Sequence, residues 1–170
     1  GLYAQKLAAA ANFITIAYDA SFQGESTGLP RQLENPHVRT EDISTVIDYL
    51  TTLAYVDAQN IGAMGICAGA GYSANAAIND RRIKALGTVS MVNIGQMFRN
   101  DWENTVQDHD ALPSLAMGSA ARSEDAQAMD LQAFPLAPMT KEDAPNPELE
   151  EAWEYYHTPR CEHPNAPGFM

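Results

Sequence analysis

The stretch that most constrains the fold is NIGAMGICAGAG, residues 60–71, which places a cysteine between an apolar run and a run of small residues. Residues 61–66 follow a turn signal at 57–60, a pattern typical of a strand buried in a parallel sheet. After Cys67, the small residues and the segment 72–78 favour a helix that packs close to that strand. We therefore expect a strand that runs directly into a helix, with Cys67 at the corner.

The glycines around Cys67 fit such a corner. Gly65-x-Cys67-x-Gly69 matches the nucleophile-elbow pattern with Cys in place of Ser. In that turn the nucleophile has a strained backbone, and we expect that positions 65 and 69 have no room for a Cβ atom. A thiol at a helix N-terminus faces unpaired N–H groups that favour the thiolate, and the backbone N–H of Ala68 would face a developing oxyanion. Alternatively, Cys67 is a small buried hydrophobic residue in a Gly-rich turn.

The segments around this corner alternate between helix and strand patterns. Residues 2–11 are rich in Ala and Leu and predict a helix that ends at Asn12, a residue tolerant of the left-handed cap conformation. Residues 13–18 and 85–91 have the β-branched and apolar composition of strands. Thr40 is expected to cap a further helix, whose buried face comprises Ile43, Val46, Ile47, Leu50 and Leu53. This order is typical of an α/β fold with a parallel sheet.

A polar, glycine-containing loop, residues 19–28, follows the first predicted strand. Open α/β sheets place their sites at the carboxyl ends of strands, so Asp19, Glu25 and Ser26 are candidates to line the mouth of a pocket. The alternative is an ordinary connecting loop in which these side chains stabilise the turn.

The composition changes near residue 100. The last 70 residues hold 14 of the 22 acidic side chains, 3 of the 10 basic ones and eight of the ten prolines. Short helices are expected near 100–106, 124–131 and 147–156. We therefore expect an α/β core over residues 1–95 and an acidic, Pro-rich helical cap or extension over 96–170.

In this order and spacing, four local patterns resemble the α/β-hydrolase superfamily, particularly its dienelactone-hydrolase-like and esterase or peptidase-like branches. These patterns are YAQKLAAAANFITIAYDAS, FQGESTG, VDAQNIGAMGICAGAGYSANAA and DRRIKALGTVS. The resemblance implies a partial three-layer α/β/α-hydrolase-type parallel sheet with a helical cap-like C-terminal segment. It also implies that Cys67 is a nucleophile, with Ala68 as an oxyanion donor, in the hydrolysis of esters, thioesters or lactones.

The chain departs from the family pattern in ways that matter for catalysis. By the resemblance, a second oxyanion strand would precede Gly1, and the strands carrying the acid and the catalytic His would follow Met170. None of the four histidines has the expected position, and we name none of them as the base. We expect this sequence to be a fragment of a longer hydrolase, or to be completed by another segment, and a homo-oligomer is the other partner that we consider.

The remaining features narrow the function classes. A net charge of −12 argues against nucleic acid and anionic membranes as partners, and the apolar runs are too short to span a bilayer. Two cysteines, one in a nucleophile position, suggest a reducing compartment, which we take as the cytoplasm. Cys161 with His157 and His163 offers only three ligands, so we expect no metal, and no phosphate loop or other cofactor signature is present.

The expected partner is a small acyl substrate. Two alternatives remain: a glutamine-amidotransferase-type Cys enzyme and a non-catalytic binding protein of the same fold.

Overall fold

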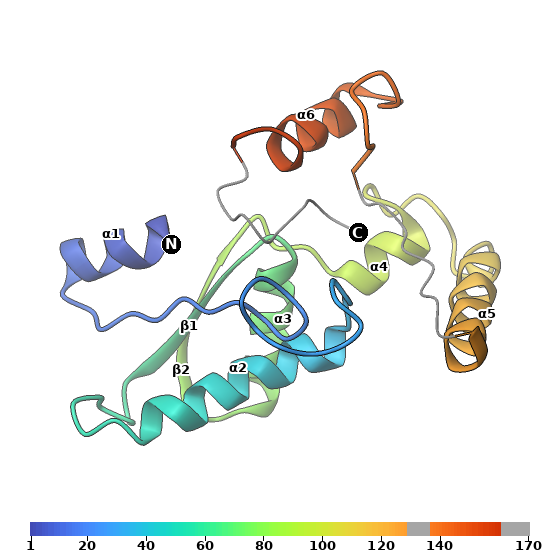
Figure 1. Ribbon diagram of the computed structural model, residues 1–170. Coiled ribbons are helices and arrows are strands. Elements are labelled where there is room, and N and C mark those ends of the chain that lie inside the picture. The colour runs from blue at the N-terminus through green and yellow to red at the C-terminus, as the bar shows by residue number, and fades with distance from the viewer. Residues whose placement is uncertain (129–136, 161–170) are drawn as a thin grey trace. The chain divides into compact units, whose positions relative to one another are not determined.

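A computed structural model of the protein describes residues 1–128 and 137–160, which form a mixed α/β fold (Figure 1). Along the chain the elements are α1 (Leu2–Ala11), α2 (Pro36–Thr51), β1 (Ile61–Ile66), α3 (Ala68–Asn79), β2 (Ile83–Val89), α4 (Ile94–Asn100), α5 (Leu112–Ala128) and α6 (Pro147–Tyr156). They belong to two compact units. The first comprises residues 1–21 and 35–93, and the second comprises residues 22–34 and 94–170.

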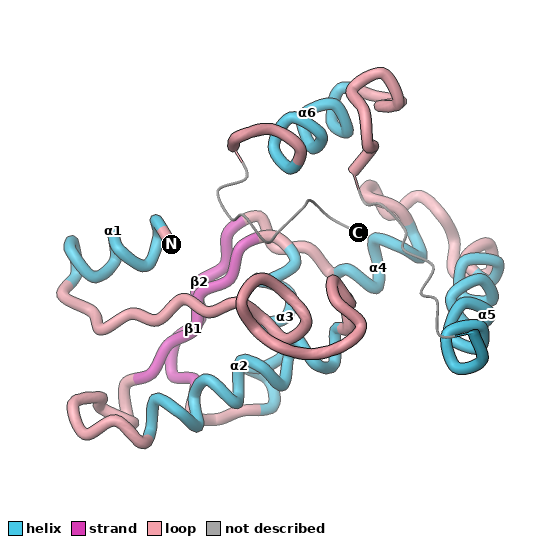
Figure 2. The backbone as a smooth tube through the Cα atoms, in the orientation of Figure 1, coloured by secondary structure: helices cyan, strands magenta, loops and turns pink. Residues whose placement is uncertain are grey.

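The first unit is built on a parallel pair of strands, β1 and β2, joined by helix α3 (Figure 2). Helix α3 contacts both strands, and α2 packs on α3. Strand β1 and the helix after it confirm the strand-to-helix corner read from the sequence. Strand β2 covers residues 83–89 rather than the predicted 85–91, because Ser90 takes a left-handed φ of 46° that breaks the ladder.

The core of this unit is made by α2, α3 and Ile61 at the start of β1. Ile43 and Ile47 are buried on α2, and Ala70, Tyr72 and Ala76 are buried on α3. Ile43 and Ile47 are four positions apart, and on α3 the buried residues Ala70, Ser73 and Ala76 are three apart with Tyr72 beside them, so each helix buries one stripe. The small side chains of α3 allow its backbone to lie close to the strands and to α2.

Helix α2 begins earlier than predicted. Its N-cap is Asn35, whose side-chain oxygen accepts hydrogen bonds from the backbone N–H groups of His37 and Val38 at 3.0 and 3.4 Å. Pro36 occupies the first helical position, where its fixed φ suits the helix and its missing N–H costs nothing. The predicted cap at Thr40 is therefore wrong: its hydroxyl donates to the Pro36 carbonyl within the helix.

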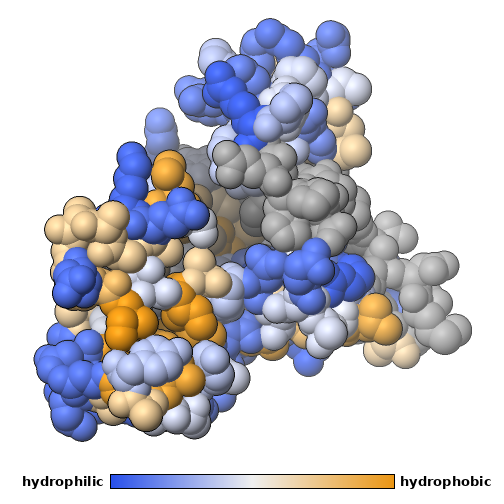
Figure 3. Space-filling view, turned by 60° about the vertical axis from the view of Figure 1, so that its left-hand side comes forward, coloured by the Kyte–Doolittle hydropathy of each residue, from blue (hydrophilic) through white to orange (hydrophobic). Residues whose placement is uncertain are grey.

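The first segment of the chain matches its prediction in one part only. Helix α1 has the expected bounds, and Asn12 ends it with φ 57° and ψ 33°, which confirms the left-handed cap. Residues 13–18, predicted as a strand, form no ladder with any residue that the structure describes. Their apolar side chains remain exposed, with 61% of Phe13 and 62% of Ile14 accessible. Figure 3 shows that apolar residues lie at the surface among hydrophilic ones on the face drawn there.

A turn stabilised by side-chain hydrogen bonds precedes each strand of the sheet. Before β1, the Asp57 carboxylate accepts from the Gln59 N–H and the Asn60 amide, and these bonds lower the pKa of Asp57. After α3, the Asp80 carboxylate accepts from the Arg82 side chain and N–H, and this partner holds the pKa of Asp80 well below its usual range. Arg82 also pairs with Asp48 of α2, which ties this turn to the core helix.

In the second unit, helices α4 and α5 differ from the predicted helices, whereas α6 matches its prediction. Helix α6 has the predicted bounds, whereas α5 covers 112–128 in place of the predicted 124–131, of which 129–131 lie outside the described residues. Helix α4 ends at Asn100, where a helix had been predicted to begin. None of the helices described by the structure is both long and apolar enough to cross a membrane.

Candidate functional site

Cys67 lies at the corner between β1 and α3, and its side chain is exposed to solvent. Its backbone has φ 54° and ψ −124°, a conformation that L-residues rarely adopt and that costs about 1–3 kcal/mol. Exposure removes the alternative that Cys67 is a buried hydrophobic residue. The structure instead shows a thiol that is accessible to solvent on a residue with a strained backbone.

Hydrogen bonds from separate parts of the chain hold this conformation. The Cys67 N–H donates to the Val89 carbonyl at 2.9 Å. The Cys67 carbonyl accepts from the N–H groups of Ala70, Gly71 and Val92 at 3.1, 3.4 and 3.2 Å. Both backbone polar groups of the strained residue are therefore satisfied, which is how a fold maintains an unfavourable φ.

The glycines of the corner have different roles from those expected. A Cβ on Gly65 would lie 2.3 Å from the Gly69 carbonyl oxygen and 2.5 Å from Ala70 backbone atoms, so the prediction for Gly65 is confirmed. The prediction for Gly69 is wrong, because a Cβ there would meet no described atom within 4 Å. Gly69 lies in the first turn of α3 with its Cα turned to open space. The second crowded position is Gly71, where a Cβ would lie 2.3 Å from the Val92 carbonyl oxygen.

The N-terminus of α3 offers N–H groups beside the thiol. Cys67 is the N-cap of this helix, and Ala68 and Gly69 are its first two residues. Over residues 1–128 and 137–160, no carbonyl accepts from the Ala68 or Gly69 N–H, whereas the N–H groups of Ala70 and Gly71 are already paired. The structure therefore shows no backbone acceptor for the Ala68 N–H in the described ranges, and its role as an oxyanion donor stays a prediction. In the same described ranges, no side chain hydrogen-bonds to the Cys67 thiol.

The three predicted pocket residues are divided between the units. Asp19 is half-buried in the first unit, whereas Glu25 and Ser26 belong to the second. In the second unit, the Ser26 N–H donates to the Gln23 carbonyl at 2.9 Å, and the Arg31 guanidinium donates to the carbonyls of Ser26 and Gly24. The loop is therefore well ordered by its own hydrogen bonds, and a role in lining a pocket remains a prediction for all three residues.

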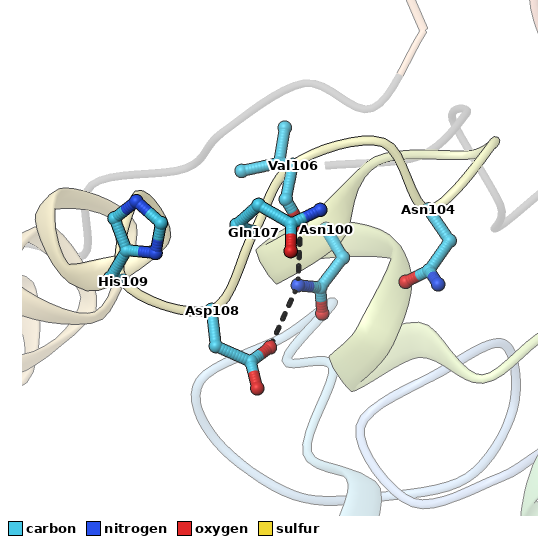
Figure 4. Close-up of a pocket in the computed structure, with 6 residues that line it drawn as sticks. All are labelled: Asn100, Asn104, Val106, Gln107, Asp108 and His109. Atoms are coloured by element: carbon cyan, nitrogen blue, oxygen red, sulfur yellow. Dashed lines mark hydrogen bonds between the residues drawn. The ribbon is translucent and has the colours of Figure 1, made fainter.

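A separate polar pocket of about 240 Å³ lies in the second unit (Figure 4). It is lined by Asn100, Asn104, Val106, Gln107, Asp108 and His109. The buried Asn100 amide donates to the Val106 carbonyl at 2.8 Å and to the Asp108 carboxylate at 3.0 Å, as the dashed lines show. These bonds occupy the amide within the protein itself, so the pocket is explained by the packing of its loop.

Metal ligands do not gather in the part of the chain that the structure describes: no group of three His, Cys, Asp or Glu side chains could hold an ion there. Of the weak candidate cluster in the sequence, Cys161 and His163 lie outside the described residues. His157 ends helix α6 as its C-cap.

Comparison with known proteins places the chain beside longer relatives, while no family model matches it. It is 68% identical over 169 residues to the uncharacterized protein YcjY of Escherichia coli (strain K12), covering 99% of this chain and 55% of that protein. The crystal structure of hypothetical protein PA2218 from Pseudomonas aeruginosa matches with a TM-score of 0.84 and 32% identity, covering 99% of this chain and 52% of that one. The chain thus spans about half the length of the relatives that it matches.

Two shorter matches carry enzyme names. The acyltransferase drtE of Aspergillus calidoustus is 35% identical over 75 residues, which are 44% of this chain and 24% of that protein. The thiohydrolase apmlB of Arthrinium phaeospermum is 36% identical over 80 residues, which are 47% of this chain and 26% of that protein.

Proposed function

We propose that this chain carries the nucleophile of an enzyme that hydrolyses esters, thioesters or lactones, and that Cys67 is that nucleophile. The observation that carries the proposal is the exposed thiol on a residue with a φ of 54° at a strand-to-helix corner. Strained residues of this kind cluster at active sites, because the fold must hold them against their own preference. The names of the two shorter matches, an acyltransferase and a thiohydrolase, support the same class of chemistry.

The reaction divides into two acyl transfers. The Cys67 sulfur, after losing its proton to a base, attacks the acyl carbon, and an S–C bond forms. The bond from that carbon to the leaving oxygen or sulfur then breaks, and the leaving group takes up a proton. Water next attacks the enzyme thioester, releases the acid and restores the thiol. In each tetrahedral intermediate the Ala68 N–H donates to the oxyanion. We assign no residue of this chain as the base.

The surrounding fold in this proposal is a three-layer α/β/α-hydrolase sheet. Residues 1–95 would supply part of its core, and residues 96–170 a helical cap or extension. Support comes from the parallel pair β1–β2 joined by α3, and from the exposed apolar side chains of residues 13–18, which form no ladder with a described strand. Strands from another segment or a second copy would complete the sheet, the substrate would be a small acyl compound, and the enzyme would act in the cytoplasm.

The test is hydrolysis of acyl thioesters and nitrophenyl esters by the purified protein and by Cys67→Ala. We expect kcat/KM of the variant to fall by at least about 1,000-fold, because a nucleophile that acts through a covalent intermediate has no substitute. Protein quenched in acid during turnover should also carry an acyl adduct on the peptide containing Cys67.

Cys161→Ala is the matched control, since it removes the other thiol of the sequence. It should hydrolyse the substrates at the wild-type rate. Turnover that survives in Cys67→Ala, or an acyl adduct on Cys161 alone, would contradict the proposal.

A further inference from the structure

We propose that Gly71 is a positioning residue for Cys67, because it lets residues 90–93, the turn after β2, close on the strand-to-helix corner and fix the backbone that carries the thiol. The proposal rests on the assignment of Cys67 as nucleophile. Gly71 lies four residues after Cys67 and outside the Gly-x-Cys-x-Gly pattern. The proposal therefore adds a position to those that the pattern itself marks as needed for the reaction.

Hydrogen bonds show how this turn holds the corner. The Cys67 N–H donates to the Val89 carbonyl at 2.9 Å, and the Val92 N–H donates back to the Cys67 carbonyl at 3.2 Å. The two backbone polar groups of Cys67 are therefore bonded to the last residue of β2 and to the turn that follows it. Between these two contacts, Ser90 has a left-handed φ of 46°, which turns the chain back toward Cys67.

The absence of a side chain at Gly71 is what makes this closure possible. A Cβ there would lie 2.3 Å from the Val92 carbonyl oxygen and 3.4 Å from its carbonyl carbon. Both are backbone atoms, so no rotation of a side chain can relieve the clash. The Gly71 N–H also donates to the Cys67 carbonyl at 3.4 Å, so the backbones of Cys67, Gly71 and Val92 meet at one point.

A methyl group at position 71 must therefore separate α3 from residues 90–93. The bond from the Val92 N–H to the Cys67 carbonyl would lengthen or break. With one of its restraints gone, Cys67 can relax from its φ of 54°, and its sulfur moves away from the N–H groups at the start of α3. Gly71 thus acts through Cys67 and does not touch the substrate.

The experiment compares Gly71→Ala with Gly87→Ala, a glycine of β2 whose added Cβ would lie 3.6 Å from the Met64 side chain, an ordinary contact. Two readouts are followed: kcat and KM for ester hydrolysis, and the rate at which iodoacetamide alkylates the Cys67 peptide. For Gly71→Ala we expect kcat to fall about 100-fold with little change in KM, as for a misplaced reacting group. Alkylation should slow about 5-fold as the thiol leaves the helix end. Gly87→Ala should match the wild type in both.

Hydrogen exchange of the wild-type protein tests the same contact without any substitution. The Val92 amide should exchange at least about 100-fold more slowly than an exposed amide, since it donates to Cys67. Fast exchange at Val92 would overturn the proposal, even if Gly71→Ala does not fold. So would a folded Gly71→Ala variant with wild-type kcat and alkylation rate. If Cys67→Ala retains turnover, the proposed function fails, whereas slow alkylation of Gly71→Ala would still support the positioning role.

Discussion

Among the turns that place a non-glycine residue at positive φ, the turns at Cys67 and at Asp101 hold that residue in opposite ways. Cys67, after β1, has φ 54° and is fixed by backbone groups from α3 and from the turn after β2. Asp101, after α4, has φ 67° and is fixed by its own carboxylate, which accepts from the N–H groups of Glu103 and Thr105 at 2.9 and 3.0 Å. Asp stabilises its turn through local bonds, whereas Cys has no such means. The strain at Cys67 is therefore imposed by its surroundings, and this supports the role proposed for Cys67.

The largest loss of stability should follow from adding a methyl group at Gly65, where the backbone of β1 lies against the backbone of α3. Gly65→Ala would press a methyl group onto the Gly69 oxygen and the Ala70 backbone, at 2.3 and 2.5 Å. We expect the free energy of unfolding to fall by about 3 kcal/mol, because only backbone movement can relieve the clash. Urea unfolding followed by circular dichroism measures this change.

Gly69→Ala is the matched control on the other side of Cys67. Its Cβ would meet no described atom within 4 Å, and Ala favours the helix over Gly by up to about 1 kcal/mol. Its stability should therefore equal or exceed that of the wild type. If Gly65→Ala and Gly69→Ala lowered the free energy of unfolding equally, the crowding that the structure shows at Gly65 and not at Gly69 would be contradicted.

A smaller loss of stability is expected in the loop after α4, which the Asn100 side chain holds by hydrogen bonds. Asn100→Ala removes a buried amide that donates to the Val106 carbonyl and the Asp108 carboxylate. Leaving that carbonyl without its donor should cost about 1–2 kcal/mol. Gln107→Ala, an exposed neighbour in the same pocket, should change the free energy of unfolding by less than about 0.5 kcal/mol. If both substitutions are neutral, the loop after α4 is not held by its amide.

The elements that the sequence predicted well are those whose signals are local. The strand 61–66, the helix after Cys67, the left-handed cap at Asn12 and helix α6 all follow from neighbouring residues. The end of α4 also has a local cause, since the Asp101 carboxylate competes for the next N–H groups, and the Asn-Asp pair at 100–101 could have signalled it.

What the sequence could not supply depends on distant backbone. Gly71 is crowded by Val92, 21 positions later, and only the close approach of α3 to the turn after β2 brings them together. Gly69 fits the motif as well as Gly65 does, yet only Gly65 faces another backbone. Residues 13–18 could form a strand only if another strand lay beside them. Their composition, rich in β-branched residues, favours a strand but does not say whether a partner strand is present.

The smallest loss of stability is expected at Asp80. It tests whether the size of the loss depends on how a turn is held or on the unit that contains the turn. Asp80 belongs to the same unit as Cys67, but its turn is held by a carboxylate that accepts from Arg82. Asp80→Asn keeps the shape and removes the charge, so we expect a loss of about 1 kcal/mol at pH 7.

This loss should depend on pH in a defined direction. Pairing with Arg82 holds the pKa of Asp80 below that of the unfolded chain, near 4. The native state then binds fewer protons than the unfolded state in that range, so the contribution of Asp80 is complete above about pH 5 and is lost as the pH falls through the native pKa. The difference in the free energy of unfolding between wild type and Asp80→Asn should therefore be constant from pH 8 to about pH 5 and shrink at lower pH. Urea midpoints measured across that range check this, and a difference that grows as the pH falls would show that the carboxylate does not stabilise the turn by its charge.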